Sequence, residues 1–143
     1  MESEYNPSLM IAAGLNTLAA LLHLWVIMAG PRGYRLFGAG ERFIRAAEAG
    51  KIFPAVATAG IATVMLIWAT YALSGAGAVP TLPLLRPMLC VITVIYLLRG
   101  IAGPLVLRGT GRSNRFIIVS SLICLGFGLI HLTGLIQRWP QLT

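Results

Sequence analysis

Three ionisable side chains, His23, Arg99 and His131, lie inside long apolar segments of the sequence. If these segments span a membrane, each ionisable group is costly there and is therefore a candidate functional residue. Arginine donates two parallel hydrogen bonds from a planar fork, which suits phosphate and carboxylate groups. Asn16 is a weaker, uncharged fourth member of this set. These residues indicate either binding of an anionic molecule or polar contacts between helices.

The segments that carry these residues have the length and composition of transmembrane helices. The 143-residue chain is 57% hydrophobic and only 10% charged, with a mean hydropathy of +0.84. A soluble domain carries about 25% charged residues. The apolar runs do not alternate with period two, as the strands of a membrane β-barrel would. We expect one all-α transmembrane domain over residues 1–143, a four-helix bundle with spans at about 8–30, 52–74, 84–107 and 116–137.

Basic residues concentrate in two of the three connections between these spans. The first loop, residues 31–51, holds Arg32, Arg35, Arg42, Arg45 and Lys51, and the third holds Arg108, Arg112 and Arg115. Lys and Arg are enriched in cytoplasmic loops. We therefore expect a multi-pass protein of the bacterial inner (cell) membrane, with both loops in the cytoplasm and both termini outside. The acidic N-terminus lacks the basic segment of a signal peptide, so we expect the first span to be retained.

The net charge of +7 would suggest nucleic acid in a soluble protein. Here the basic residues flank apolar spans, so we expect anionic lipid headgroups as partners and no nucleic acid. The five basic residues of the first loop are the candidate headgroup-binding residues. Residues 38–50 allow two interpretations: a short interfacial helix with Phe43 and Ala47 facing inward, or an extension of the second span.

Depth along the helices indicates which intramembrane groups can meet. At 1.5 Å rise per residue, His23 and Arg99 both lie roughly 6 Å from the midplane on the cytoplasmic side. His131 lies roughly 7 Å to the other side, so the two histidines are about 13 Å apart along the membrane normal. One zinc ion cannot join groups so far apart, and a haem held by both is disfavoured. We expect no metal, no cofactor and no catalytic residue among them, and His131 more often as a contact between helices than as a ligand.

Two stretches of the sequence, 21–44 and 97–117, are similar to each other. Both run Leu-Leu, Ala-Gly-Pro, Gly-x-Gly and Arg-Phe-Ile, although the alignment needs gaps. A true repeat would make the bundle two parallel helical hairpins, and coincidence is the alternative. The repeat aligns His23 with Arg99, which supports the idea that they are neighbours.

These hints together define a candidate ligand site on the cytoplasmic half of the membrane. None of the four spans contains an acidic residue. The partner of Arg99 is therefore either Glu48, at the end of the second span, or an anionic ligand. The expected ligand is a lipid or another hydrophobic or anionic molecule. The expected ligand-binding residues are His23, Tyr96, Arg99 and Glu48.

Small residues recur every fourth position on two spans. They are Ala55, Ala59 and Thr63 on the second span and Ser120, Cys124 and Gly128 on the fourth. Such stripes let helix backbones approach closely in a membrane. We expect them to pack inside the bundle, with homo-oligomerisation as the alternative.

Residues 41–54, ERFIRAAEAGKIFP, resemble the first-loop signature of the membrane-associated eicosanoid and glutathione metabolism proteins. Arg45-Ala46 and Pro54 match, whereas the signature's asparagine is absent, Glu48 is displaced and the spacing is shorter. The resemblance covers about a tenth of the chain. It implies a four-helix membrane enzyme that acts as a trimer with glutathione.

Three functions follow as alternatives. The first is a non-enzymatic bundle that binds or moves a lipid. The second, implied by the resemblance, is a glutathione- or lipid-modifying enzyme that holds an anionic substrate between Arg42, Arg45, Glu48 and Arg99. The third is an accessory subunit that packs against a larger membrane complex.

Overall fold

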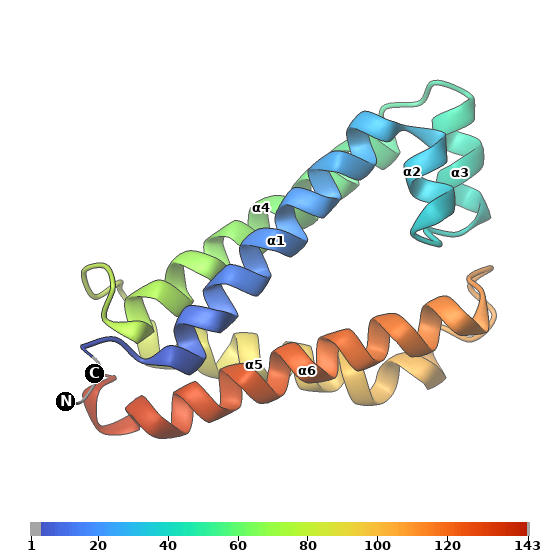
Figure 1. The fold of residues 1–143 in the computed structure, drawn as a ribbon. Helices are drawn as coiled ribbons and strands as arrows, with labels where there is room; N and C mark the ends of the chain where they lie inside the picture. Colours follow the sequence, from blue (N-terminus) through green and yellow to red (C-terminus); the bar gives the residue numbers. More distant parts are fainter. Residues whose placement is uncertain (1–3, 143) are drawn as a thin grey trace.

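Four long helices dominate residues 4–142, which are the residues that the computed structural model describes (Figure 1). These helices are α1 (Pro7–Ala29), α4 (Phe53–Ala76), α5 (Leu85–Val106) and α6 (Asn114–Arg138). They contain 22 to 25 residues each. At 1.5 Å per residue they reach at least about 33 Å, enough for the roughly 30 Å hydrocarbon core of a bilayer. All four are long and apolar enough to cross a membrane, so the predicted all-α membrane bundle is confirmed.

The four long helices form two antiparallel hairpins. Helix α1 packs along α4, and α5 packs along α6, whereas contacts between the hairpins are fewer and run mainly from α1 to α6 and from α4 to α5. Figure 1 shows the hairpins converging at the end that holds both termini and diverging toward the opposite end. We call these the terminal end and the basic end. Helices α1 and α5 therefore occupy diagonal corners of the bundle.

The hairpins are joined at the terminal end by close packing and hydrogen bonds. Leu9 is fully buried, and both Gly75 of α4 and Gly134 of α6 leave room for its side chain. Asn6 Nδ2 donates to Gln137 Oε1 at 2.8 Å, while Asn6 Oδ1 caps α1 by accepting from the Leu9 N–H. These contacts hold the two hairpins together at the terminal end.

Two short helices connect α1 to α4 at the basic end. They are α2 (Pro31–Leu36) and α3 (Glu41–Glu48). Gly30, with φ +60°, turns the chain, and Pro31 begins α2 because a proline at the first helical position loses no hydrogen bond. The expected end of the first span near residue 30 agrees with the end of α1, but the helix that follows was not predicted. Helix α3 is separate from α4, so residues 38–50 do not extend the second span. Phe43 and Ala47 pack inward against Ile44, Tyr34 and Val26, as expected, and the place of α3 at the membrane interface stays a prediction.

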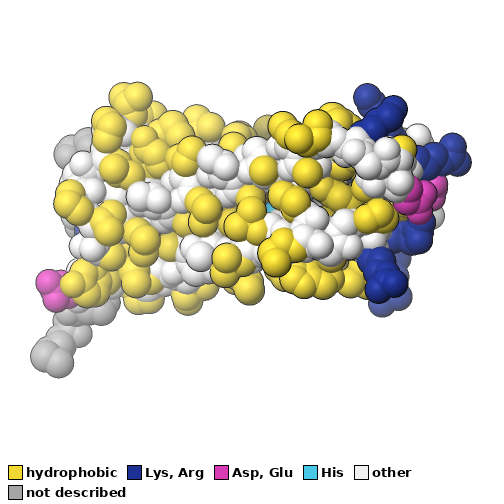
Figure 2. Space-filling model, turned by 90° about the horizontal axis from the view of Figure 1, so that it is seen from above, with side chains coloured by type: hydrophobic (Ala, Val, Ile, Leu, Met, Phe, Trp, Pro, Cys, Tyr) yellow, Lys and Arg dark blue, Asp and Glu magenta, His cyan; other side chains and the backbone are white. Residues whose placement is uncertain are grey.

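The surface of the bundle has the distribution expected for a protein solvated by lipid. Figure 2 shows hydrophobic side chains over much of the molecule's length and Lys and Arg side chains gathered at the basic end. Large exposed apolar residues occur on all four long helices, including Ile11, Ile61, Ile101 and Leu122. A soluble monomer rarely exposes so large an apolar surface.

The predicted small-residue stripes are only partly correct. On α6, Gly128 is buried and a Cβ added there would lie 2.7 Å from a methyl carbon of Leu97 on α5. On α4 the predicted stripe is misplaced, because Thr63 is exposed and the helix buries Thr58, Ala62 and Ala69 instead. A run of apolar residues with small ones on several faces does not reveal which face meets α1.

Gly100 sets the distance between α5 and α6, and we expect Gly100→Ala to destabilise the protein by about 1–3 kcal/mol. The added Cβ would lie 2.7 Å from the backbone nitrogen of Leu125 and 2.8 Å from its Cα, so the two helices must separate. Gly126→Ala on α6 is the matched control, since nothing lies within 4 Å of its Cβ position. In thermal unfolding in detergent, the melting temperature of Gly100→Ala should be well below that of Gly126→Ala. Equal stabilities would contradict this packing.

Candidate functional site

Arg99 is held inside the α5–α6 hairpin by two serine hydroxyl groups. Its Nη1 donates to Ser121 Oγ at 3.2 Å and its Nη2 donates to Ser120 Oγ at 3.1 Å. Both serines belong to α6, and the Arg99 side chain is half-buried. Within residues 4–142, no carboxylate forms an ion pair with it. The guanidinium is therefore a cation in a transmembrane segment whose protein partners are neutral.

Gly103 provides the space for this arrangement. An added Cβ at Gly103 would collide with both the Arg99 Nη1 atom and the Ser121 hydroxyl. The guanidinium thus lies beside Gly103, one helical turn closer to the basic end than its own Cα. Long cationic side chains in membranes extend in this way toward the polar interface.

The other predicted site residues do not gather around Arg99. Glu48 forms an ion pair with Arg35 and, within residues 4–142, none with Arg99, so of the two alternatives for the partner of Arg99 the one with Glu48 is wrong. His23 Nδ1 donates to the Ala19 carbonyl of its own helix at 2.7 Å. His23 also lies on α1, diagonal to α5, so similar depth does not make it a neighbour of Arg99. The roles of His23, Tyr96 and Glu48 in binding stay predictions.

Tyr96 belongs instead to a buried polar network with Asn16 and His131. The Tyr96 hydroxyl donates to Asn16 Oδ1, and Asn16 Nδ2 lies 3.2 Å from His131 Nε2 and 3.0 Å from the Ala12 carbonyl oxygen. His131 Nδ1 lies 2.8 Å from the Phe127 carbonyl oxygen, which can only accept, so Nδ1 carries the proton. Nε2 then accepts from Asn16, and the hydrogen bonds of the network are mutually consistent.

The network joins the two hairpins midway along the bundle. Asn16 lies on α1, Tyr96 on α5 and His131 on α6, and their exposed fractions are 0%, 4% and 1%. The Tyr96 ring also packs edge-on against Trp68 of α4, with ring centroids 5.1 Å apart. The prediction that His131 is a hydrogen-bonded contact between helices is confirmed. Among residues 4–142, no group of three or more His, Cys, Asp or Glu side chains is placed to hold a metal ion.

The basic residues of the first loop are exposed at the basic end. Two of them have acidic partners: Arg35 pairs with Glu48, and Arg45 Nε lies 3.5 Å from a carboxylate oxygen of Glu41. Arg42 lies over the Phe53 ring at 5.4 Å. Arg32 and Lys51 are exposed as well. All five lie where lipid headgroups would be, and their binding to headgroups stays a prediction.

The same contacts bear on the resemblance of residues 41–54 to a glutathione-dependent family. Arg45 and Glu48 are occupied by partners on α3 and α2, and within residues 4–142 Glu48 forms no ion pair with Arg99. Comparisons of the whole chain with protein families, curated proteins and solved structures found no match. The enzyme alternative therefore gains no observation in its favour.

Proposed function

We propose that this multi-pass membrane protein binds an anionic amphiphile, a lipid or a lipid-like carboxylate or phosphate, through Arg99. The observation that carries the proposal is a half-buried guanidinium in a transmembrane helix that has two serine hydroxyls and, among residues 4–142, no carboxylate as partners. A cation in hydrocarbon is costly by several kcal/mol, and such residues usually pair with an opposite charge or mark a ligand path. An anionic headgroup supplies the missing charge.

A purely structural role for Arg99 explains these contacts less well. Ser120 Oγ lies 3.3 Å from the Ile117 carbonyl oxygen, so this hydroxyl has a backbone partner whether or not Arg99 is present. Two neutral acceptors also leave other guanidinium N–H groups without a partner among residues 4–142. A ligand carboxylate or phosphate can accept these remaining hydrogen bonds in the paired geometry that arginine favours.

Native mass spectrometry of the detergent-purified protein tests this proposal. We expect anionic lipid to copurify with the wild type, and Arg99→Gln to reduce the bound fraction by about ten-fold or more, since charged hydrogen bonds contribute about 1.5–3 kcal/mol. Arg86→Gln is the control: Arg86 is on the same helix but at the terminal end, bonded to the Trp139 carbonyl and stacked on its ring. Wild-type protein without anionic lipid, or equal binding by all three proteins, would refute the proposal.

We further infer that the basic end faces the cytoplasm and both termini face outward. Five basic residues of the first loop and three of the third lie at the basic end, against Arg86 and Arg138 at the terminal end. A C-terminal reporter that is active only in the cytoplasm should remain inactive, and a periplasmic reporter at the same position should be active. The opposite result would invert the topology.

A further inference from the structure

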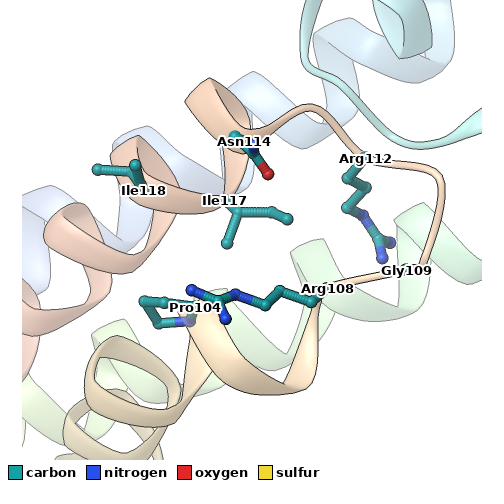
Figure 3. A pocket seen from close by; sticks show the side chains of 7 residues that line it. All are labelled: Pro104, Arg108, Gly109, Arg112, Asn114, Ile117 and Ile118. Carbon is teal, nitrogen blue, oxygen red and sulfur yellow. The ribbon is translucent and has the colours of Figure 1, made fainter.

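A half-open cavity of about 450 Å³ lies where α5 ends and α6 begins, at the basic end. This volume is within the roughly 300–1,000 Å³ typical of small-molecule sites. Its polar lining comes from Arg108, Arg112 and Asn114, and its apolar lining from Pro104, Ile117 and Ile118. Figure 3 shows the Arg108 side chain running back along α5 above Pro104, Arg112 descending from the loop, and Asn114 and Ile117 approaching from α6. Both arginines line the cavity, with the Arg108 guanidinium over Pro104 and the Arg112 guanidinium directed toward Gly109 on its other side (Figure 3).

The charges of these two arginines are not neutralised by the protein. Arg108 forms no hydrogen bond or ion pair with any residue from 4 to 142. Arg112 donates to the Thr110 hydroxyl at 3.3 Å and lies 6.0 Å from the Phe116 ring centre. The two glutamates of the basic end, Glu41 and Glu48, are both paired with arginines of the first loop. The described residues that line the cavity therefore carry an excess of positive charge and include no acidic group.

The apolar lining gives the cavity an amphiphilic character. Ile117 is buried in the floor, whereas Ile118 has 54% of its surface exposed on the flank of α6. Leu122, one helical turn further from the basic end, is 62% exposed and continues that apolar strip. A molecule with its anionic group beside the two arginines could lay a hydrocarbon chain along this strip.

Arg99 adds a third cation to the same helix pair. Its guanidinium contacts Ser121, one turn along α6 from Ile117, and lies beside Gly103, the neighbour of Pro104. One helical turn is about 5.4 Å, so Arg99 is only slightly deeper in the membrane than the cavity floor. Cationic groups consequently follow the α5–α6 pair from the interface into the hydrocarbon region.

We propose that this cavity binds the phosphate group of a phospholipid, with Arg108 and Arg112 as the phosphate-binding residues and an acyl chain along Ile118 and Leu122. This inference rests on the proposed function and assigns the amphiphile its chemical class. Arg108 and Arg112 hold the phosphate in the cavity, and Arg99, about one helical turn deeper, adds its positive charge to the same site. This assignment also changes the expected headgroup site from the first loop to the third. Arginine donates several charge-assisted hydrogen bonds to phosphate oxygens. An anionic phospholipid, which lacks the choline cation of a zwitterionic one, is favoured beside two arginines that have no acidic partner among residues 4–142.

Binding of a fluorescent phosphatidylglycerol to the full-length protein in phosphatidylcholine nanodiscs tests the assignment. We expect the double variant Arg108→Gln/Arg112→Gln to bind about ten-fold or more weakly than the wild type. The control is Arg42→Gln/Arg45→Gln, which removes the same charge from the same end. Its dissociation constant for the lipid should be at least about three-fold lower than that of Arg108→Gln/Arg112→Gln. Thermal unfolding of each variant verifies that the bundle is intact.

The possible results separate the two proposals. Wild-type protein that binds no phosphatidylglycerol overturns the proposed function and this inference together. Wild-type binding that both double variants reduce equally, or that Arg108→Gln/Arg112→Gln leaves unchanged, overturns the cavity alone. Millimolar inorganic phosphate should not displace the lipid, and displacement would mean that the cavity takes free phosphate instead of a phospholipid.

Discussion

We expect Asn16→Ala to lower the free energy of unfolding by about 2–4 kcal/mol, since each buried polar group left without a partner costs about 1–3 kcal/mol. Asn16 is fully buried and is the residue that both Tyr96 and His131 contact. Alanine at this position leaves the Tyr96 hydroxyl without its acceptor and His131 Nε2 without its donor. Hydrogen bonds within membranes are often weaker than this, about 0.6 kcal/mol on average, but the variant removes three at once and adds a cavity.

Thr17→Ala provides the matched control for this prediction. Thr17 follows Asn16 on α1, and its hydroxyl donates only to the Ala13 carbonyl of the same helix, at 2.9 Å. Its loss should change stability by no more than about 0.5 kcal/mol. Equilibrium unfolding in mixed micelles measures both variants. If Asn16→Ala is no less stable than Thr17→Ala, the network does not join the hairpins.

The second large effect is an increase in the free energy of unfolding. In a neutral detergent free of anionic lipid, we expect Arg99→Leu to be more stable than the wild type by about 1–2 kcal/mol. A central arginine costs about 2.5–3.5 kcal/mol on insertion scales, and the two serines and the approach to the basic end offset part of that cost. A site maintained for a ligand characteristically reduces stability in the ligand's absence.

Arg86→Leu distinguishes this effect from a general benefit of removing charge. Arg86 lies on the same helix, but its guanidinium is 3.1 Å from the Trp139 carbonyl oxygen and 4.7 Å from the Trp139 ring. Its replacement should therefore decrease stability. Adding phosphatidylglycerol should raise the melting temperature of the wild type and leave that of Arg99→Leu unchanged. An Arg99→Leu variant that is less stable than the wild type in neutral detergent would establish a structural role for Arg99 and contradict our account.

The sequence predicted the four spans to within two residues at every end. The span expected at 8–30 is Pro7–Ala29, and the span expected at 116–137 is Asn114–Arg138. Such accuracy follows from the solvent, because every backbone polar group in hydrocarbon needs an internal partner and only a continuous helix supplies it. The short helix α2 was not predicted, because residues 31–51 were expected to be a loop, although a proline such as Pro31 also starts helices.

The candidate site was harder to predict, because depth along a helix does not specify which helices are neighbours. His23 and Arg99 share a depth but occupy diagonal helices. Tyr96 and Arg99 are three residues apart, yet Tyr96 reaches Asn16 and Arg99 reaches Ser120 and Ser121. Asn16 was ranked below the ionisable residues, and its central position depends on the hairpin arrangement. Ser120, which the sequence placed on the small-residue stripe of α6, could have indicated the contact, because a serine hydroxyl can accept a hydrogen bond from an arginine on the facing helix.

An experimental structure in a phospholipid bilayer or mesophase tests the central claim most directly, through the density beside the Arg99 guanidinium. We expect an elongated ligand whose phosphate or carboxylate oxygen lies within hydrogen-bonding distance of Arg99 or, for a phospholipid, reaches Arg108 and Arg112. Density for water alone at all three guanidinium groups, or a carboxylate from another protein chain paired with Arg99, would contradict the claim.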